Sequence, residues 1–480
     1  MNVKRNTIVR TLALCAVLLL VAGTASAQAN FGKYVAIGDS LTAGFASGGL
    51  LAEVQERSYP ALIADQAGVA DFQQPLAGAP GIPPLLAIQG FANGSPIITP
   101  RAAQPGPPLN LTLQRPYDNL AVPGYDTAEA LTVVSDPNNP LSDLVLRGLG
   151  TMVQQALVQQ PTFVTVWLGN NDVLGAATSG IVIDGVTLTR RGDFRNAYRT
   201  ILGAVAQSGA QMAVANIPDV TALPFVATIP PVVVNPATSQ PVLGPNGQPI
   251  PLIGPQGPLG PGDFVLLSAS GLLAQGIGIP AAVGGTNQPL PDQVVLSASE
   301  ANRVRQRTNE LNAEIGAAAG DFGAALVDVH GFFEEVKRDG FPAGANIIYT
   351  TDFLTGGIFS YDGVHPSPMG YAVSANLFID AINARFGDSI PAVNLIPFIF
   401  GPDGSAGSTI PAAGLGNGNA VFSNAAYDGL HASLGLPPMS ELLRIRDNRE
   451  KRPDKGGDAP RLGIDRPKSS RPTLSLSIGQ

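Results

Sequence analysis

The chain has 480 residues and is poor in several residue types, and each shortage excludes a class of protein. It contains a single cysteine, Cys15, so a disulfide framework is excluded. It has three histidines, and three histidines with one cysteine are too few ligands to make a Cys/His zinc site plausible. Charged residues make up 13%, and the net charge of −8 argues against a nucleic-acid partner held through its phosphates.

Glycine and proline are abundant instead, at 56 and 43 residues. Such residues lengthen loops without adding domains. Hydrophobic residues make up 45% of the chain, which is enough to bury a core. We therefore expect a globular chain with long loops. Beyond the first thirty residues no apolar run reaches about 18 residues, so no later membrane helix is expected.

Residues 1–27 have the pattern of a secretory signal peptide. A basic start at residues 4–10 precedes an apolar run from Leu12 to Gly23 and a small-residue cleavage signal, Ala25-Ser26-Ala27. An uncleaved membrane anchor is the alternative, but the apolar run is short for a membrane span. A lipid attached to Cys15 is disfavoured because a bulky leucine precedes that residue. The pattern predicts an exported protein that is periplasmic, bound to the cell surface or secreted, with no transmembrane helix after cleavage.

Short apolar runs alternate with stretches of helical spacing, which predicts a parallel sheet in an α/β domain. The predicted strands are residues 34–37, 163–168, 212–216 and 324–329. The predicted helices are residues 144–158, 194–208, 297–319 (with Ser299 as a plausible cap) and 369–386.

The main folded domain is expected over residues 28–440, interrupted by two Pro/Gly-rich insertions near 75–116 and 223–295. The first insertion is predicted to be a long loop. Residues 441–480 hold ten basic and six acidic residues and little apolar content, which predicts a disordered basic tail. The basic stretch from Arg444 to Arg471 could make a weak contact with an anionic envelope surface, and a merely solvated tail is the alternative.

The tripeptide Gly38-Asp39-Ser40 directly follows the first predicted strand. A serine in the turn between a strand and a helix can project its hydroxyl at the carboxyl edge of a sheet, where α/β proteins bind ligands. The helix N-terminus beneath it would stabilise negative charge. The same tripeptide is common in ordinary turns, and it recurs at 387–389 after a predicted helix. That second copy has no strand before it and is predicted to be a plain turn.

Three further sequence blocks carry residues that could act together with the serine at position 40. Gly124, in the loop 119–124, could present a bare backbone N–H above the sheet. Asn171, in the block 169–172, follows the second predicted strand, and its amide could point into the same region. Asp362 precedes His365 by three residues, so its carboxylate could orient an imidazole that takes a proton from a serine. Taken singly, each block could equally be a turn or a surface loop.

Together and in this order, the four blocks resemble the SGNH hydrolases, also called the GDSL esterase/lipase family, over about residues 31–386. The resemblance implies a three-layer α/β/α sandwich with a parallel, flavodoxin-like sheet, here carrying long insertions. It implies an ester substrate and neither a metal nor an organic cofactor. The chain has no Gly-x-Ser-x-Gly motif, which counts against the α/β-hydrolase fold.

The resemblance also assigns roles to individual residues. Ser40 would be the nucleophile, His365 its general base, and Asp362 the group that orients the histidine. The oxyanion hole would consist of the backbone N–H groups of Ser40 and Gly124 and the side-chain amide of Asn171. A proline directly before Gly124 restricts the approach to its N–H.

A second Asp-x-x-His pair, Asp428 and His431, could combine with Ser389. His365 is favoured because it is followed by Pro366 to Tyr371 and a helix, as in members of the family. The remaining histidine, His330, ends the fourth predicted strand and is interpreted as structural.

These features favour a secreted serine hydrolase that cleaves carboxylic esters through an acyl-Ser40 intermediate. Apolar residues at 264–267 and 272–273 could wall a pocket for an acyl chain, which favours lipid or fatty-acyl esters as the substrate, or could pack against the rim of the sheet. A carbohydrate O-deacetylase is an alternative, although the one tryptophan, Trp167, lies in a predicted core strand rather than in an aromatic cluster. A non-catalytic surface or binding protein on the same scaffold is an alternative of another class.

Overall fold

The structure is a computed structural model that describes residues 28–450 except 93–94, 236–237, 345–346 and 401–419. The predicted signal peptide, residues 1–27, and residues 451–480 of the predicted tail lie outside the described residues. Among the described helices, none combines the length and the apolar character that a membrane span requires.

Four parallel strands form the central sheet in the order β1-β4-β5-β10. They are β1 (Tyr34–Gly38), β4 (Phe163–Trp167), β5 (Gln211–Ala215) and β10 (Ala325–Val327). An extended segment around Asn119 continues the sheet beside β1, with Ala36 N–H donating to Asp118 O at 2.8 Å. β1 and β4 are buried along their whole length and β5 nearly so, which explains why the sequence shows short continuous apolar runs there, whereas Leu326 of the edge strand β10 is 44% exposed.

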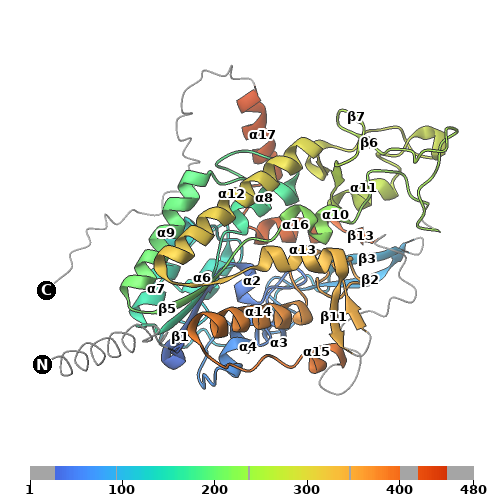
Figure 1. The fold of residues 1–480 in the computed structure, drawn as a ribbon. Helices are drawn as coiled ribbons and strands as arrows, with labels where there is room; N and C mark the ends of the chain where they lie inside the picture. Colours follow the sequence, from blue (N-terminus) through green and yellow to red (C-terminus); the bar gives the residue numbers. More distant parts are fainter. Residues whose placement is uncertain (1–27, 93–94, 236–237, 345–346, 401–419, 451–480) are drawn as a thin grey trace, which may run out of the picture.

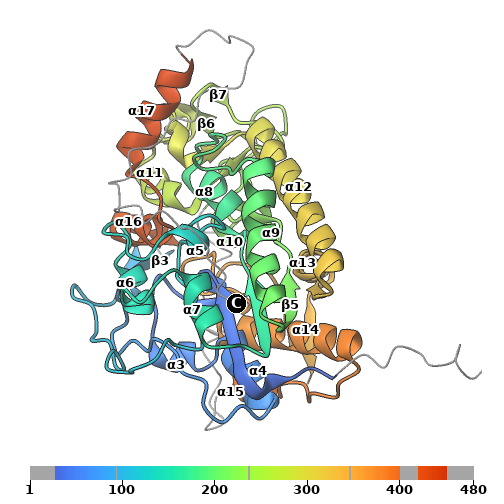
Figure 2. The same cartoon turned by 90° about the vertical axis from the view of Figure 1, so that its left-hand side faces the viewer.

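Helices cover both faces of this sheet, so the molecule has the predicted three-layer α/β/α architecture (Figures 1 and 2). Alternate strand residues point to opposite faces. Val164 and Val214 pack in one buried cluster with α7 (Met152–Val158), α9 (Arg191–Gln207) and α12 (Ala298–Phe322). Phe163 and Ala213 pack in a second cluster with α4 (Tyr59–Gln66) and α14 (Pro368–Phe386).

Two predicted helices differ in detail from the structure. The helix expected over 144–158 is in fact two, α6 (Pro140–Leu146) and α7, because Arg147 adopts a left-handed conformation at φ 51° and ends the first. The long helix α12 is capped by Ser297, not by Ser299 as predicted. Ser297 accepts from the N–H of Glu300, whose carboxylate in turn accepts from the N–H of Ser297, forming a capping box.

The first insertion is not a plain loop, so that prediction is wrong. Strands β2 (Leu86–Ala92) and β3 (Ser95–Pro100) pair antiparallel, and β13 (Val421–Phe422) pairs with β3 in parallel. Two prolines of the insertion, Pro96 and Pro100, lie in β3 but outside the two residues that pair with β13, where a missing N–H donor is tolerated, and the high Pro/Gly content obscured the strands.

The second insertion contains only short elements and has its own small core, which includes Val233, Leu252, Val265 and Leu290. Its elements are α10 (Pro224–Ala227), β6 (Ile253–Gly254), β7 (Gly257–Pro258), β8 (Phe264–Val265) and α11 (Ser270–Ala274), and β8 pairs with β9 (Val295–Leu296). The remaining elements are α2 (Ser40–Ala43), α3 (Ala52–Gln55), α5 (Glu129–Thr132), α8 (Asn171–Ser179), α13 (Val329–Asp339), β11 (Phe341–Gly344), β12 (Ile347–Tyr349) and α15 (Ile396–Phe400).

The C-terminal region is more ordered than predicted. Helix α16 (Asn424–Ser433) precedes α17 (Met439–Glu450), so residues 441–450 are helical and not a disordered tail. Leu442 is buried against Ile181 and Ile183, and Arg446 forms an ion pair with Asp292. Further apolar residues of the helix pack on the same cluster, and Arg449 donates to Asp184 O at 2.9 Å. These contacts with distant segments fix the helix, and the sequence alone does not show them.

Candidate active site

Ser40 is the first residue of α2, directly beyond the carboxyl end of β1. The tight turn requires a glycine at position 38, because a Cβ there would lie 1.9 Å from the hydroxyl of Thr42. Asp39 caps the helix by accepting from the N–H of Leu41 at 3.0 Å. The N–H of Ser40 lies in the first turn of the helix, where no intrahelical acceptor exists. Hydroxyl and N–H are thus both presented at the sheet edge.

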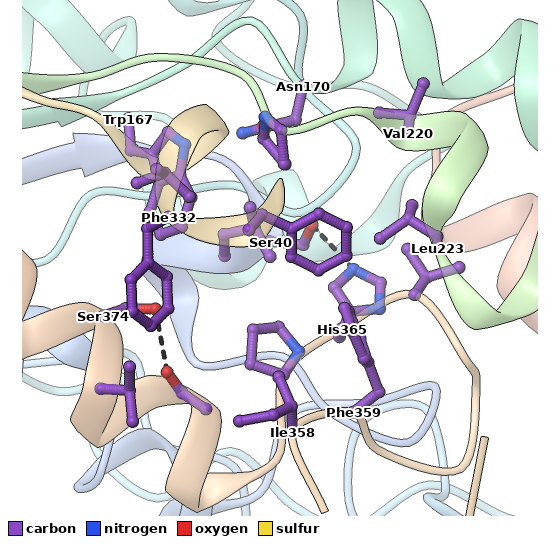
Figure 3. Close-up of a pocket in the computed structure, with 18 of the residues that line it drawn as sticks. Ser40, Trp167, Asn170, Val220, Leu223, Phe332, Ile358, Phe359, His365 and Ser374 are labelled. Atoms are coloured by element: carbon purple, nitrogen blue, oxygen red, sulfur yellow. Dashed lines mark hydrogen bonds between the residues drawn. The ribbon is translucent and has the colours of Figure 1, made fainter. Parts of the chain in front are cut away.

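A hydrogen-bonded chain links Ser40 to His365 and Asp362. His365 Nε2 lies 2.9 Å from Ser40 Oγ (Figure 3). On the other side of the ring, His365 Nδ1 lies 2.9 Å from Asp362 Oδ2. An ionised carboxylate can only accept, so Nδ1 carries the proton and Nε2 is free to accept the serine proton. Both Asp362 and His365 are fully buried, and Ser40 is 3% exposed. This is the geometry of a serine nucleophile with its general base.

Asp362 is held in its charged form by its surroundings. Burial alone would raise the pKa of Asp362, but the charge of His365 and hydrogen bonds from backbone N–H groups lower it below its usual value. Those donors are the N–H groups of Val364 at 2.9 Å and His365 at 2.8 Å, and Gly48 N–H also donates at 2.8 Å. The carboxylate is therefore fixed in place and available to stabilise an imidazolium.

We expect Asp362→Asn to lower kcat by about 10⁴-fold, because an amide facing Nδ1 favours the imidazole tautomer that cannot accept the serine proton. Steady-state ester hydrolysis measures the effect. The matched control is Asp428→Asn, the same change at the exposed aspartate of the second Asp-x-x-His pair, which should leave kcat unchanged. An equal loss of kcat in both variants would show that Asp362 has no specific role in the mechanism.

Sequence reasoning missed the link between Asp39 and Asn170. Asn170 Nδ2 donates to Asp39 Oδ2 at 2.8 Å, which ties α2 to the turn between β4 and α8. Burial raises the pKa of Asp39 to about 6 despite this hydrogen bond. An aspartate directly before a helix is a capping signal, and this could have indicated the structural role of Asp39.

Gly124 lies in a turn of residues 122–125. Tyr125 N–H donates to Val122 O at 3.2 Å, and Gly124 has a φ of +86°. Proline at the second position and glycine at the third are typical of a type II turn, which explains the Pro123-Gly124 sequence. Val122 N–H donates to Gly38 O at 3.2 Å, so the turn lies beside the carboxyl end of β1. Within the described chain, the N–H of Gly124 donates to no acceptor.

Asn171 is the first residue of α8, and its amide Nδ2 donates to Tyr125 O at 3.0 Å. It therefore lies beside the Gly124 turn, whereas Asn170 lines the cavity at Ser40 (Figure 3). The structure thus joins Ser40, His365 and Asp362 by hydrogen bonds and places Gly124 and Asn171 next to each other. The oxyanion roles of the latter two remain predictions.

An apolar cavity of about 80 Å³ opens at Ser40 and His365. Figure 3 shows side chains from several separate segments converging on it. Its apolar wall consists mainly of Trp167, Leu174, Val220, Leu223, Val329, Phe332, Phe333, Ile358, Phe359, Val364, Val373 and Leu377. Leu223, the first residue of the 223–295 insertion, lines the cavity, but none of the apolar residues at 264–267 and 272–273 does, and Leu266 and Leu267 are buried in the main core. The apolar segment of the insertion therefore packs against the domain and does not wall this cavity.

The other histidines have different surroundings. His330 lies in the first turn of α13, with Nδ1 3.0 Å from Ile217 O, consistent with a structural residue. His431 lies in α16, and its Nε2 is buried without a hydrogen-bond partner among the described residues. Asp388, beside Ser389, accepts from Ala29 N–H at 2.5 Å. In the described part of the chain, no group of three or more potential metal ligands is found.

The family model described as GDSL-like Lipase/Acylhydrolase matches residues 34–378. An alpha/beta hydrolase from the metagenome of Lake Arreo, Spain, is 14% identical, with 76% of this chain and 100% of that chain covered and a TM-score of 0.32. A catalytic mutant of an acetylxylan esterase from Geobacillus stearothermophilus is 12% identical, with 73% and 93% covered and a TM-score of 0.32. No curated protein matches the chain.

Proposed function

Because the chain belongs to the GDSL-like lipase/acylhydrolase family, we propose that it is an exported serine hydrolase that cleaves carboxylic esters with an apolar acyl chain. One observation carries the proposal: the hydrogen-bonded chain Ser40–His365–Asp362 opens into an apolar cavity. The signal-peptide pattern of residues 1–27 supports export. The excess of basic residues in the tail supports a weak contact of the tail with an anionic surface.

The reaction proceeds by acyl transfer to Ser40. His365 Nε2 takes the hydroxyl proton while Ser40 Oγ attacks the carbonyl carbon, and the N–H groups of Ser40 and Gly124 stabilise the resulting oxyanion. The imidazolium then protonates the departing alkoxide, which leaves as an alcohol and yields acyl-Ser40. Water repeats the same steps with His365 as base, releasing the carboxylic acid and restoring the serine.

The cavity favours an apolar acyl chain over an acetyl group on a sugar. Each buried methylene contributes about 0.8 kcal/mol, or roughly a fourfold gain in kcat/KM. An acetyl group would leave most of the apolar wall without contacts, and sugar hydroxyls would meet few polar side chains there. The O-deacetylase alternative therefore has less support.

A series of p-nitrophenyl esters from acetyl to palmitoyl tests this proposal. We expect kcat/KM to rise roughly fourfold per methylene until the cavity is filled. Phe332→Ala enlarges the cavity and should move the optimum to longer chains. Phe341→Ala is the matched control, because its ring packs on Phe332 outside the cavity at 5.9 Å between centroids.

Two results would contradict the proposal in different ways. A maximum at the acetyl ester, followed by a steady decline, would favour the O-deacetylase. A wild-type protein that hydrolyses none of the esters would favour the binding-protein alternative.

A further inference from the structure

The peptide between Pro123 and Gly124 is held on its carbonyl side by Asn139. Asn139 Nδ2 donates to Pro123 O at 2.7 Å. A trans peptide is planar, so its N–H points opposite to its C=O. A group that fixes the Pro123 carbonyl therefore also fixes the direction of the Gly124 N–H.

Asn139 is itself firmly positioned. It is 2% exposed and caps α6, with its Oδ1 accepting from the N–H of Leu141 at 3.2 Å. Leu141 and Leu144 of the same helix are buried in one cluster with Ala121, two residues before Pro123. Both ends of the Asn139 amide are thus used, and its helix is packed against the segment that it holds.

The turn after α16 packs against the other side of Gly124. A Cβ on Gly124 would lie 2.6 Å from Ser433 O and 2.9 Å from Gly435 N, so the two backbones are in direct contact. The next residue, Leu436, packs over Gly175 of α8, the helix that begins at Asn171. Residues 433–436 lie outside the matched family range of 34–378.

The segment that supplies this contact is anchored to the rest of the molecule. β13 pairs with β3, α16 lies beside β3 (Figures 1 and 2), and Phe422 N–H donates to Ser270 Oγ at 2.8 Å. The Tyr427 ring stacks on Phe225 at 6.5 Å between centroids. The turn 433–435 is therefore a fixed surface against which Gly124 rests.

We propose that Asn139 and the turn 433–435 are positioning groups that keep the Gly124 N–H aimed at the oxyanion. Glycine at the third position of a turn also tolerates a type I conformation, in which the central peptide is flipped. A flip would turn the N–H away and direct a carbonyl oxygen toward the developing negative charge. Asn139 prevents the flip through the carbonyl, and the 433–435 backbone prevents it by contact. This inference rests on the proposed function and on Gly124 as an oxyanion donor.

Asn139→Asp separates positioning from helix capping. Aspartate caps helices as well as asparagine does, so α6 keeps its cap. The amide donor is lost, and a carboxylate oxygen then faces the Pro123 carbonyl and favours the flip. We expect kcat to fall by roughly 10- to 100-fold, somewhat less than the loss of a whole oxyanion donor, with KM little changed. The melting temperature should fall as well, because the new carboxylate is buried beside a carbonyl oxygen. Asn138→Asp, the same change at the exposed neighbouring residue, is the matched control and should keep wild-type kcat.

Gly435→Ala independently tests the contact between the 433–435 backbone and Gly124. Its Cβ would lie 3.2 Å from Gly124 O, and the position has a φ of +65°. Gly429→Ala, in α16 with open space around the added methyl, is the matched control. We expect a loss of kcat in Gly435→Ala and none in Gly429→Ala.

The diagnostic readout is the inhibition constant of an alkylboronic acid, which forms a tetrahedral adduct on Ser40 and places an oxygen in the oxyanion hole. The inhibition constant should rise in proportion to the loss of kcat/KM in Asn139→Asp and Gly435→Ala. The inference is overturned if both variants keep wild-type kcat, or if kcat falls while the inhibition constant is unchanged. In either case the proposed function stands as long as the wild type hydrolyses esters and Ser40→Ala does not. An inactive wild type overturns both.

Discussion

Ser40→Ala is expected to lower kcat on every ester by on the order of 10⁴- to 10⁶-fold, because the only nucleophile of the acyl-transfer step is removed. The change deletes one oxygen atom that lies 2.9 Å from His365 Nε2, so the fold should be retained. Initial rates and the melting temperature of the purified variant measure both effects. The residual rate would reflect the oxyanion donors and substrate binding alone.

The matched control is Ser389→Ala, the serine of the second Gly-Asp-Ser tripeptide. It follows the end of α14 and has no strand before it, so this variant should keep wild-type kcat. Full activity in Ser40→Ala, or a comparable loss of kcat in Ser389→Ala, would show that Ser40 is not the nucleophile.

His365→Ala is expected to cause a loss of similar size, on the order of 10⁴- to 10⁶-fold in kcat, because serine and its general base act as a unit. His365 is fully buried and its ring lies 4.7 Å from that of Phe45, so the alanine variant also leaves a cavity. His365→Gln retains most of the side-chain volume but cannot act as a base near neutral pH. It should be as inactive as the alanine variant while its melting temperature is closer to wild type.

His431→Ala is the control for this prediction, since His431 belongs to the competing Asp-x-x-His pair. The ring lies in α16, and burial lowers its pKa below the usual value of histidine. We expect this variant to retain kcat. Loss of activity in His431→Ala together with normal activity in His365→Gln would contradict the assignment of the base.

Much of the sheet and the catalytic chain could be predicted from the sequence because the signals are local. Each predicted strand overlaps an observed one, since strands buried on both faces are continuous apolar runs. Ser40 directly follows such a run, and Asp362 and His365 are three residues apart, so one turn brings them together.

Other features could not be predicted because they depend on contacts between distant segments. The β2–β3 pair is completed by β13, which lies far along the chain. Asn170 lines the cavity at Ser40 whereas its neighbour Asn171 contacts Tyr125, because consecutive side chains at the start of a helix point in different directions. The cavity wall combines residues from β4, α13, α14 and the His365 loop, and the apolar insertion that seemed suited to this role packs elsewhere.

The contact between Gly124 and Gly435 also joins distant segments and could not be predicted from the sequence. Neither glycine belongs to a sequence pattern that indicates the other, and only the fold shows that their backbones meet. A sequence search restricted to the matched range of 34–378 would leave the second one out.

The most direct test of the acyl-Ser40 mechanism is to trap the intermediate. Wild-type protein is mixed with a medium-chain p-nitrophenyl ester, quenched with acid during turnover and examined by intact-mass and peptide mass spectrometry. The mechanism predicts a mass increase equal to one acyl group, located on the peptide that contains Ser40 and absent from Ser40→Ala. Turnover with no adduct, or an adduct on a different residue, would contradict it.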